Sequence, residues 1–166
     1  PEMFLREEKP SILQVGYWLR KPDSICRLKS PYPYVKKWLP SDNEYAMKIL
    51  EFYNRTNPSY FQEKYNWSGV EILDWLSNDD YDKMLTSGIV FLDLYDSSAN
   101  NAVIECIARN TPLLVNRHPA IVEYCGEDYP LYFENLDHAA SILHDRELII
   151  SAHEYFKNMN KRWING

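Results

Sequence analysis

Two hydrophobic patterns alternate along this chain. Short apolar runs, typical of strands buried in a parallel sheet, occur at residues 11–16, 34–38, 70–75, 89–94, 112–115 and 130–133. Apolar residues at helical spacing mark the segments between and after them, at residues 22–29, 43–53, 79–86, 99–109, 120–124, 137–143 and 146–163. This alternation predicts a three-layer α/β domain, in which a mainly parallel sheet of about six strands has helices on both faces.

The predicted sheet also indicates where a ligand would bind. Ligands of open parallel sheets bind beyond the carboxyl ends of the strands, where the strand order reverses. We therefore expect the site on the loops that follow Val15, Trp75 and Leu94. The sequence contains no internal repeat and no sign of a second domain, so residues 1–166 are expected to form a single domain.

Composition and charge exclude several classes of protein. The 166 residues include 18 basic and 24 acidic side chains, a net charge of −6, so we expect no nucleic-acid binding. No apolar run reaches the roughly 20 residues that span a bilayer, and no secretion signal leads the chain, which favours a cytoplasmic location. The five glycines form no Walker A loop, Gly-x-Gly-x-x-Gly fingerprint or Gly-x-Ser-x-Gly elbow. Helix N-termini and side chains must therefore hold any phosphate.

The most informative stretch is residues 93–105, where a strand ends in small polar residues and a helix begins. Small residues let an anion approach the free N–H groups at the start of a helix, where the helix dipole favours negative charge. Asn101 and Glu105 are four residues apart and so share one face of that helix. Glu105 has apolar neighbours in sequence, so its carboxylate needs a partner, which the two hydroxyl groups of a ribose would supply. Alternatively, Ser98 only caps the helix, and Glu105 faces solvent or pairs with Arg109.

Three motifs follow one another in this region: the run 97–105, the strand Asn110-Thr-Pro-Leu-Leu-Val115 and the turn Pro119-Ala-Ile-Val-Glu-Tyr124. In this order they resemble the C-terminal half of GT-B glycosyltransferases, the Rossmann-like domain that binds the nucleotide sugar. That family typically shows a Glu-x7-Glu segment, then a strand with Thr-Pro-Val-Val, then a turn with Pro and Glu. The resemblance is strongest from about Val70 to Phe133, and it implies that the chain is one half of a GT-B fold.

The resemblance implies a role for each residue that matches the motif. Glu105 matches the second Glu, which usually binds the nucleotide ribose. Residues 98–102, which include Ser98, Asn100 and Asn101, match the link whose backbone amides face the diphosphate and the sugar. Ser97 stands where the family has its first Glu, so the contact of that Glu with the donor sugar is in question. Asp96, one residue earlier, would replace it only from a different direction.

The loop after the first strand of such enzymes carries basic residues toward the phosphates. Here this loop begins at Gly16, which we expect to line the site, and it offers Arg20 and Lys21 as the catalytic cations. Arginine suits a diphosphate because its fork binds two oxygens, although a solvated Arg20 beside Asp23 is the alternative. Ser77 follows the third strand, where the family holds the base mainly through backbone contacts.

Metal and thiol chemistry have weaker signals. Asp80-Tyr-Asp82 matches the Asp-x-Asp motif of metal-dependent GT-A enzymes, but acidic residues are favoured in the first turn of any helix, so we predict no metal site. His118 lies in the loop after a strand, where it either faces the sugar or is a surface residue. The three cysteines are far apart and odd in number, so we interpret them as reduced, packed thiols.

We therefore expect a metal-independent GT-B glycosyltransferase domain without a cofactor. Its substrate would be a nucleoside diphosphate sugar, a UDP-sugar or a GDP-sugar, and a separate N-terminal domain would bind the acceptor. The first residue is Pro1, so we expect a piece of a longer protein that is inactive alone. Two alternatives stay open: a stand-alone flavodoxin-like binding or regulatory module, and a nucleotide-sugar epimerase or hydrolase.

Overall fold

The computed structural model describes residues 8–16, 19–21, 23–32, 35–38, 69–73, 76–97 and 100–162, and the single positions 6, 48, 55 and 164. Of the predicted helix at 43–53, only position 48 is described. Trp75 and Ser98 also lie outside the described residues.

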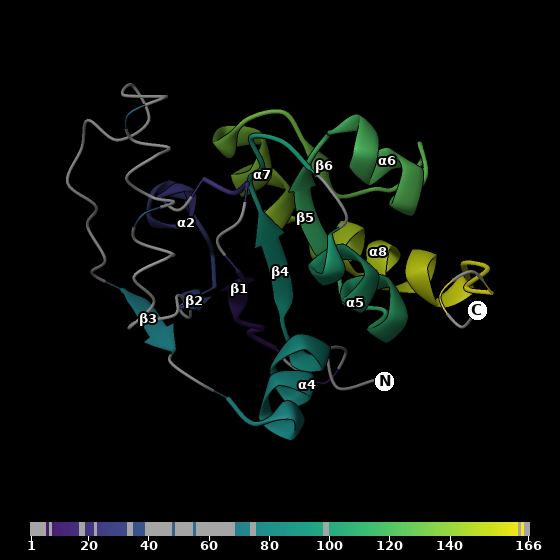
Figure 1. Cartoon of the computed structure of the whole chain (residues 1–166), viewed down its shortest axis with the longest axis horizontal. Helices are drawn as coiled ribbons and strands as arrows, with labels where there is room; N and C mark the ends of the chain where they lie inside the picture. Colours follow the sequence, from purple (N-terminus) through teal and green to yellow (C-terminus); the bar gives the residue numbers. More distant parts are fainter. Residues whose placement is uncertain are drawn as a thin grey trace.

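A sheet of six parallel strands forms the centre of the molecule (Figure 1). The strands are β1 (Ile12–Gln14), β2 (Val35–Trp38), β3 (Val70–Leu73), β4 (Ile89–Leu92), β5 (Leu113–Asn116) and β6 (Tyr132–Phe133). They lie in the order β3-β2-β1-β4-β5-β6, and every neighbouring pair is parallel. Ile12 of β1 lies opposite Val35 of β2 on one side and Ile89 of β4 on the other. The strand order therefore reverses between β1 and β4, which is where such sheets bind ligands.

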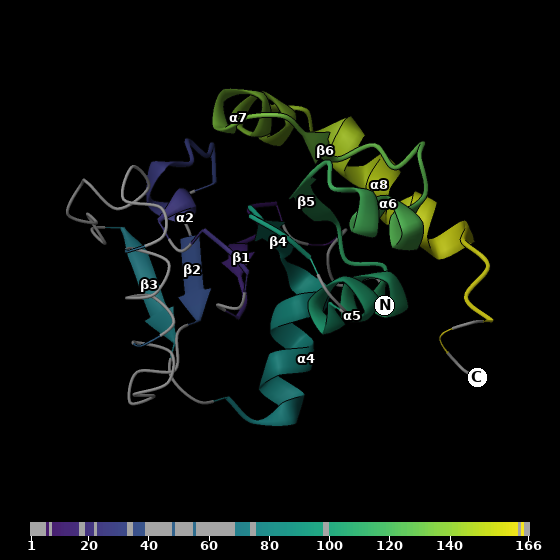
Figure 2. The same ribbon diagram turned by 45° about the horizontal axis from the view of Figure 1, so that its top comes forward.

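Helices lie on both faces of the sheet, as the sequence pattern predicts. They are α2 (Ser24–Arg27), α4 (Asn78–Ser87), α5 (Asn101–Arg109), α6 (Pro119–Cys125), α7 (Leu136–His144) and α8 (Arg146–Asn158). Figure 2 shows α4 and α5 next to each other on one side of the sheet, with α2 and α7 on the other side. Helix α8 follows α7 and contacts both α7 and α5. The predicted α/β fold class is confirmed.

Burial is most complete at β4 and β5, in the middle of the sheet. All four residues of β4 have no exposed surface, because the strand is covered on both faces. Burying each such side chain contributes about 1.5–3 kcal/mol relative to leaving it in water. Tyr129 adds a polar tie, since its buried hydroxyl donates to the carbonyl of Leu113 at 2.9 Å and accepts from the N–H of Leu113 at 2.8 Å. The loops that follow β1 and β4 thus extend from strands that are buried in the core.

Most elements differ from their predicted ranges by a few residues at the ends, and at three of these boundaries the structure shows the reason. The strand expected to reach Leu94 ends at Leu92, because the next residues pair with a loop instead. The helix expected from about residue 99 begins at Asn101, because Asn100 has an extended backbone. The last helix ends at Asn158 rather than at position 163. A turn follows it, in which the Asn160 side chain accepts a hydrogen bond from the N–H of Arg162.

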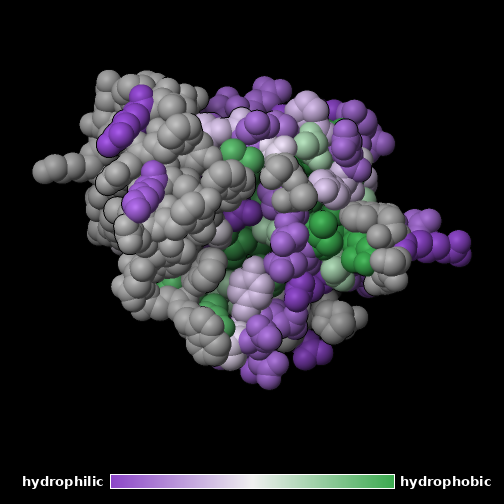
Figure 3. Space-filling view, in the orientation of Figure 1, coloured by the Kyte–Doolittle hydropathy of each residue, from purple (hydrophilic) through white to green (hydrophobic). Residues whose placement is uncertain are grey.

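The described surface is mostly hydrophilic on the face shown in Figure 3, with small hydrophobic patches between hydrophilic residues. Within the described ranges, Ile72 is the exposed large hydrophobic residue. No helix among these residues is long and apolar enough to cross a membrane.

Candidate functional site

The loops that follow β1 and β4 are joined directly. Backbone residues 19–21 run antiparallel to residues 93–95, with a bridge between Arg20 and Leu94. The N–H of Lys21 donates to the carbonyl of Asp93 at 2.8 Å, and the N–H of Tyr95 donates to the carbonyl of Leu19 at 3.0 Å. Two of the three loops predicted to form the site therefore meet at the point where the strand order reverses.

Arg20 lies in a closely fitted position within this junction. Its side chain is 8% exposed, and its Nη2 donates to the side-chain oxygen of Asn100 at 3.1 Å. Gly16, with φ of +72°, makes room for the guanidinium, since a Cβ at this position would lie 2.0 Å from Nη1 of Arg20. The predicted residues Gly16, Arg20 and Asn100 thus come together, although they are up to 84 positions apart. The alternative of a solvated Arg20 beside Asp23 is wrong, because Arg20 is buried.

The buried guanidinium of Arg20 has a hydrogen-bond donor without an acceptor among the described residues. Burial lowers the pKa of Arg20, and the nearby Tyr81, Cys106 and Glu105 act in the opposite direction. The Nε–H group is buried and has no hydrogen-bond partner among the described residues. An unsatisfied buried donor of a charged group costs free energy, so an anion at this point would be stabilised.

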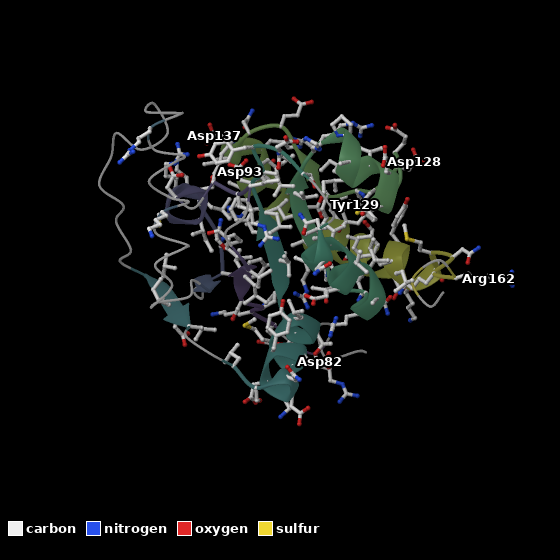
Figure 4. The ribbon with its side chains drawn as sticks, viewed as in Figure 1. Asp82, Asp93, Asp128, Tyr129, Asp137 and Arg162 are labelled. Carbon is white, nitrogen blue, oxygen red and sulfur yellow. The ribbon has the colours of Figure 1, made fainter. Side chains whose placement is uncertain are left out.

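Lys21 has a different environment from Arg20. Its ammonium forms an ion pair with Asp93 at 2.9 Å and lies 5.8 Å from the centre of the Tyr95 ring. The second oxygen of Asp93 accepts a hydrogen bond from the hydroxyl of Ser24 in α2 at 2.6 Å. Figure 4 shows Asp93 at the carboxyl end of β4, near α2. The structure therefore places Lys21 at the junction, paired with a buried carboxylate.

Glu105 lies on α5 and is partly buried. Its Oε2 accepts a hydrogen bond from the hydroxyl of Tyr81 in α4 at 2.8 Å. The alternative partner, Arg109, is engaged elsewhere: its Nε forms an ion pair with Asp82 at 2.6 Å. Asn101, four residues before Glu105, is exposed at the start of the helix. Glu105 thus has a partner within the protein, but that partner is Tyr81, which the sequence does not single out.

The remaining loop residues surround the start of α5. The backbone N–H of Ser97 donates to Oδ1 of Asp96 at 2.8 Å. His118 caps α6, since its Nδ1 accepts from the N–H of Ala120 at 3.2 Å, and its Nε2 lies 3.3 Å from Oδ1 of Asp96. Asp96, which directly precedes Ser97, is therefore held by His118 and by the backbone.

Ser77 and the Asp-x-Asp motif have structural partners. Ser77 caps α4, because its hydroxyl oxygen accepts from the N–H of Asp80 at 3.1 Å and its hydroxyl donates to the Asp80 carboxylate at 2.7 Å. Asp82 lies on α4 (Figure 4) and pairs with Arg109. Across the described ranges, no group of three or more His, Cys, Asp or Glu side chains is placed to hold a metal ion. Cys106 and Cys125 are buried free thiols, as is expected of packed cysteines.

No family model and no curated protein sequence matches this chain, but solved structures match its fold. Sucrose-phosphate synthase from Thermosynechococcus elongatus aligns with a TM-score of 0.60 and 16% identity, over 98% of this chain and 45% of its own length. WaaG, a glycosyltransferase involved in lipopolysaccharide biosynthesis, aligns with a TM-score of 0.57 and 14% identity, over 91% of this chain and 42% of its own. A variant of the O-GlcNAc transferase from Thermobaculum terrenum aligns with a TM-score of 0.57 and 11% identity, over 96% of this chain and 32% of its own.

The fold is that of a GT-B Rossmann-like domain.

This GT-B-like domain corresponds to only part of each neighbour. The chain spans less than half the length of each of these neighbours, so it matches one part of a larger protein in each case. The predicted resemblance to GT-B glycosyltransferases is confirmed at the level of the fold. The Glu-x7-Glu correspondence, with Ser97 in place of the first Glu, stays a prediction.

Sequence reasoning missed two residues of the candidate site. Asp93 is a charged residue that directly follows four apolar strand positions, a signal that would have identified it as a buried group with partners. Tyr81 carries no such signal, because an aromatic residue at helical spacing is usually a core residue. Only the packing of α4 against α5 shows that its hydroxyl reaches Glu105.

Proposed function

We propose that this domain binds the donor of a GT-B glycosyltransferase, a nucleoside diphosphate sugar such as a UDP-sugar or a GDP-sugar. The observation that carries the proposal is Arg20, a buried cation beside the first turn of α5, whose Nε–H finds no partner in the part of the chain that the structure describes. A diphosphate supplies the acceptor oxygens that this group lacks, and its negative charge is favoured at a helix N-terminus.

Backbone strain next to Arg20 supports a functional role for the junction. Leu19 has a left-handed backbone, with φ of +57°. A conformation of this kind costs about 1–3 kcal/mol for a residue with a side chain, and such strain is concentrated at binding and active sites. Leu19 directly precedes Arg20, whose guanidinium lies against Gly16.

The proposed chemistry is electrostatic. When the bond between sugar and diphosphate breaks, negative charge grows on the departing diphosphate, and a fixed cation stabilises the transition state more than the ground state. We assign this task to Arg20 and to the amides at the start of α5, near Asn100 and Asn101, without a metal ion. Lys21 joins them as a second cation only by sharing or exchanging Asp93, its partner in this structure.

Glu105 is proposed to bind the ribose of the donor. It projects from the same helix whose N-terminus faces the junction, and Arg20 is close enough to interact with it electrostatically. Gly16 and Ser97 would line the same site, with the Ser98 to Asn101 segment against the diphosphate and Ser77 near the base.

The acceptor is proposed to bind on a separate N-terminal domain. The neighbours support this proposal, since each has more than half of its length outside the part that this chain matches. We therefore expect the isolated domain to bind donor nucleotide and to transfer little or no sugar.

A thermal-shift panel with UDP, GDP, ADP, CDP and dTDP, each with and without magnesium, tests the proposal. A ligand that binds only the folded state raises the unfolding midpoint by mass action. We expect one diphosphate to stabilise the domain selectively, whether or not magnesium is present, and to lose this effect in Glu105→Gln.

The control is Glu147→Gln, the same chemical change at an exposed position on α8. It should leave the shift unchanged. If no diphosphate at millimolar concentration shifts the midpoint of the unmodified domain, the donor-binding proposal is wrong. Selective binding that Glu105→Gln leaves intact would instead remove only Glu105 from the site.

A further inference from the structure

Among the described residues, Tyr81 is the side chain that bonds to the proposed ribose-binding carboxylate. It lies in the first turns of α4, where its N–H donates to the carbonyl of Ser77 at 2.9 Å. Its partly buried ring packs against the core. Its hydroxyl crosses from α4 to α5 and donates to Oε2 of Glu105 at 2.8 Å. The contact thus joins two helices that lie side by side on the same face of the sheet (Figure 2).

The phenol of Tyr81 remains a donor at any physiological pH. Burial raises the pKa of Tyr81 well above its usual value, and the hydrogen bond to Glu105 raises it further. The direction of the hydrogen bond is therefore fixed, from the hydroxyl to the carboxylate. A hydrogen bond to a charged group is among the stronger ones in proteins, so this contact restricts the rotation of the Glu105 side chain.

The two oxygens of Glu105 have different surroundings. Tyr81 occupies Oε2, and Arg109 contacts only the backbone carbonyl of Glu105, at 3.4 Å. Among the described residues, no donor reaches Oε1, and Glu105 is not fully buried. Oε1 is thus the oxygen left for a ligand, and its direction is set by the hydrogen bond on the other oxygen.

We propose that Tyr81 is a positioning residue that fixes Glu105 so that Oε1 accepts a hydrogen bond from a ribose hydroxyl, which makes the site selective for ribonucleotides. This inference rests on the proposed donor-binding function. It adds to that function a residue on another helix and a preference for one class of sugar in the nucleotide.

Calorimetric titration tests the proposal with UDP and with 2′,3′-dideoxyuridine diphosphate, which has no ribose hydroxyls. If the panel above selects guanine, GDP and its dideoxy analogue replace this pair. In Tyr81→Phe we expect affinity for UDP to fall about tenfold, as for the loss of one hydrogen bond to a charged group. Affinity for the dideoxy analogue should not change, because that ligand makes no use of Glu105.

Tyr155→Phe is the matched control. The hydroxyl of Tyr155 also joins two elements, since it donates to the carbonyl of Cys125 at 2.8 Å, and Tyr155 is likewise partly buried. Its loss should affect stability similarly and leave the ratio of UDP to dideoxy affinity unchanged. A change of this ratio in both variants would mean a general loosening of the fold, and the Tyr81 proposal would be wrong.

The outcomes separate this proposal from the one on which it rests. If UDP does not bind to the unmodified domain, the proposed function fails. If Glu105→Gln lowers the ratio of UDP to dideoxy affinity and Tyr81→Phe does not, the site is real and the role of Tyr81 is refuted.

Discussion

At the scale of single residues, Arg20 depends on Gly16. The glycine has a left-handed backbone, and any Cβ there would fall 2.0 Å from the guanidinium. A glycine is required for two reasons, since the backbone conformation is unfavourable for other residues and the space is already filled. The guanidinium of Arg20 thus occupies space that is free only because residue 16 is a glycine.

This dependence gives a prediction with a matched control. Gly16→Ala should cost about 1–2 kcal/mol in backbone strain and should also displace the Arg20 side chain. Gly69→Ala should cost a similar amount, because Gly69 also has a left-handed backbone, with φ of +83°. Its added Cβ would have no atom within 4 Å, so no neighbour would be displaced. Urea denaturation and diphosphate titration should therefore show two destabilised variants, of which only Gly16→Ala loses binding. Equal binding by both variants would contradict the role of Arg20.

The sequence indicates residue types for the site but not their partners. Arg20 and Glu105 are recognisable because a cation and a carboxylate stand at expected positions of a strand–loop–helix pattern. Asp93 as the partner of Lys21, 72 positions away, and Tyr81 as the partner of Glu105 follow only from packing. Long-range side-chain contacts have no local signature. The sequence could therefore indicate that Asp93 is buried, but it could not predict which residue pairs with Asp93 or with Glu105.

At the scale of elements, helix α4 shows how capping defines a boundary. Ser77 and Asp80 bond reciprocally across the first turn, and this arrangement satisfies an otherwise unpaired N–H group. Ser77 thus has a structural role as the cap of α4, beside its proposed place near the base.

Replacing Ser77 separates these two roles. Ser77→Ala should lower the free energy of unfolding by about 1 kcal/mol through the lost cap. Ser141→Ala is the control, because Ser141 is an exposed serine inside α7 whose hydroxyl donates to the carbonyl of His138. It should change stability by less than about 0.5 kcal/mol. If Ser77→Ala leaves the urea midpoint where it was, the capping account is incorrect.

Most elements follow from the hydrophobic pattern, and their ends do not. The pattern identifies β4 because it has four consecutive apolar residues, as is typical of a strand in a parallel sheet. All four are fully buried in the structure. The pattern extends that strand too far because Leu94 is also apolar, and only the pairing of residues 93–95 with 19–21 ends it. The start of α5 moves to Asn101, because Asn100 has an extended backbone and its side chain bonds to Arg20.

At the scale of the whole molecule, the buried thiols and phenols determine the response to alkaline pH. Burial raises the pKa of Cys125 to about 12 and raises the pKa values of Cys106 and Tyr129 well above their usual values. In the unfolded chain these groups ionise near 9.0 for cysteine and 10.0 for tyrosine. The unfolded state therefore releases protons first as pH rises, and this favours unfolding.

We predict that the free energy of unfolding is steady below about pH 9 and falls steeply from there toward pH 12. Urea denaturation in the presence of a reductant, between neutral pH and the alkaline limit, measures the decline. Cys125→Ala removes one buried thiol and should make the slope shallower. A stability that does not change across this range would show that these groups are not buried in solution.

The arrangement of the whole sheet was predictable as a class but not in its order. Alternating strands and helices require parallel pairing, and the handedness of the connections limits the possible orders. That β4 returns to lie beside β1 is a property of the fold, and it is what joins the Arg20 loop to the start of α5. The candidate site exists because of this one crossover.

The most direct test of the account is an NMR titration of the ¹⁵N-labelled domain with the diphosphate selected by the thermal-shift panel. We predict that the amide signals of Gly16, Arg20 and residues 100–103 shift together with one affinity. The cavity of about 570 Å³ beside α6, lined by Arg117, Pro119, Val122, Glu123, Gly126 and Glu127, serves as an internal comparison. If the largest shifts occur around that cavity, or if no signal shifts, the donor site is not at the junction of the β1 and β4 loops.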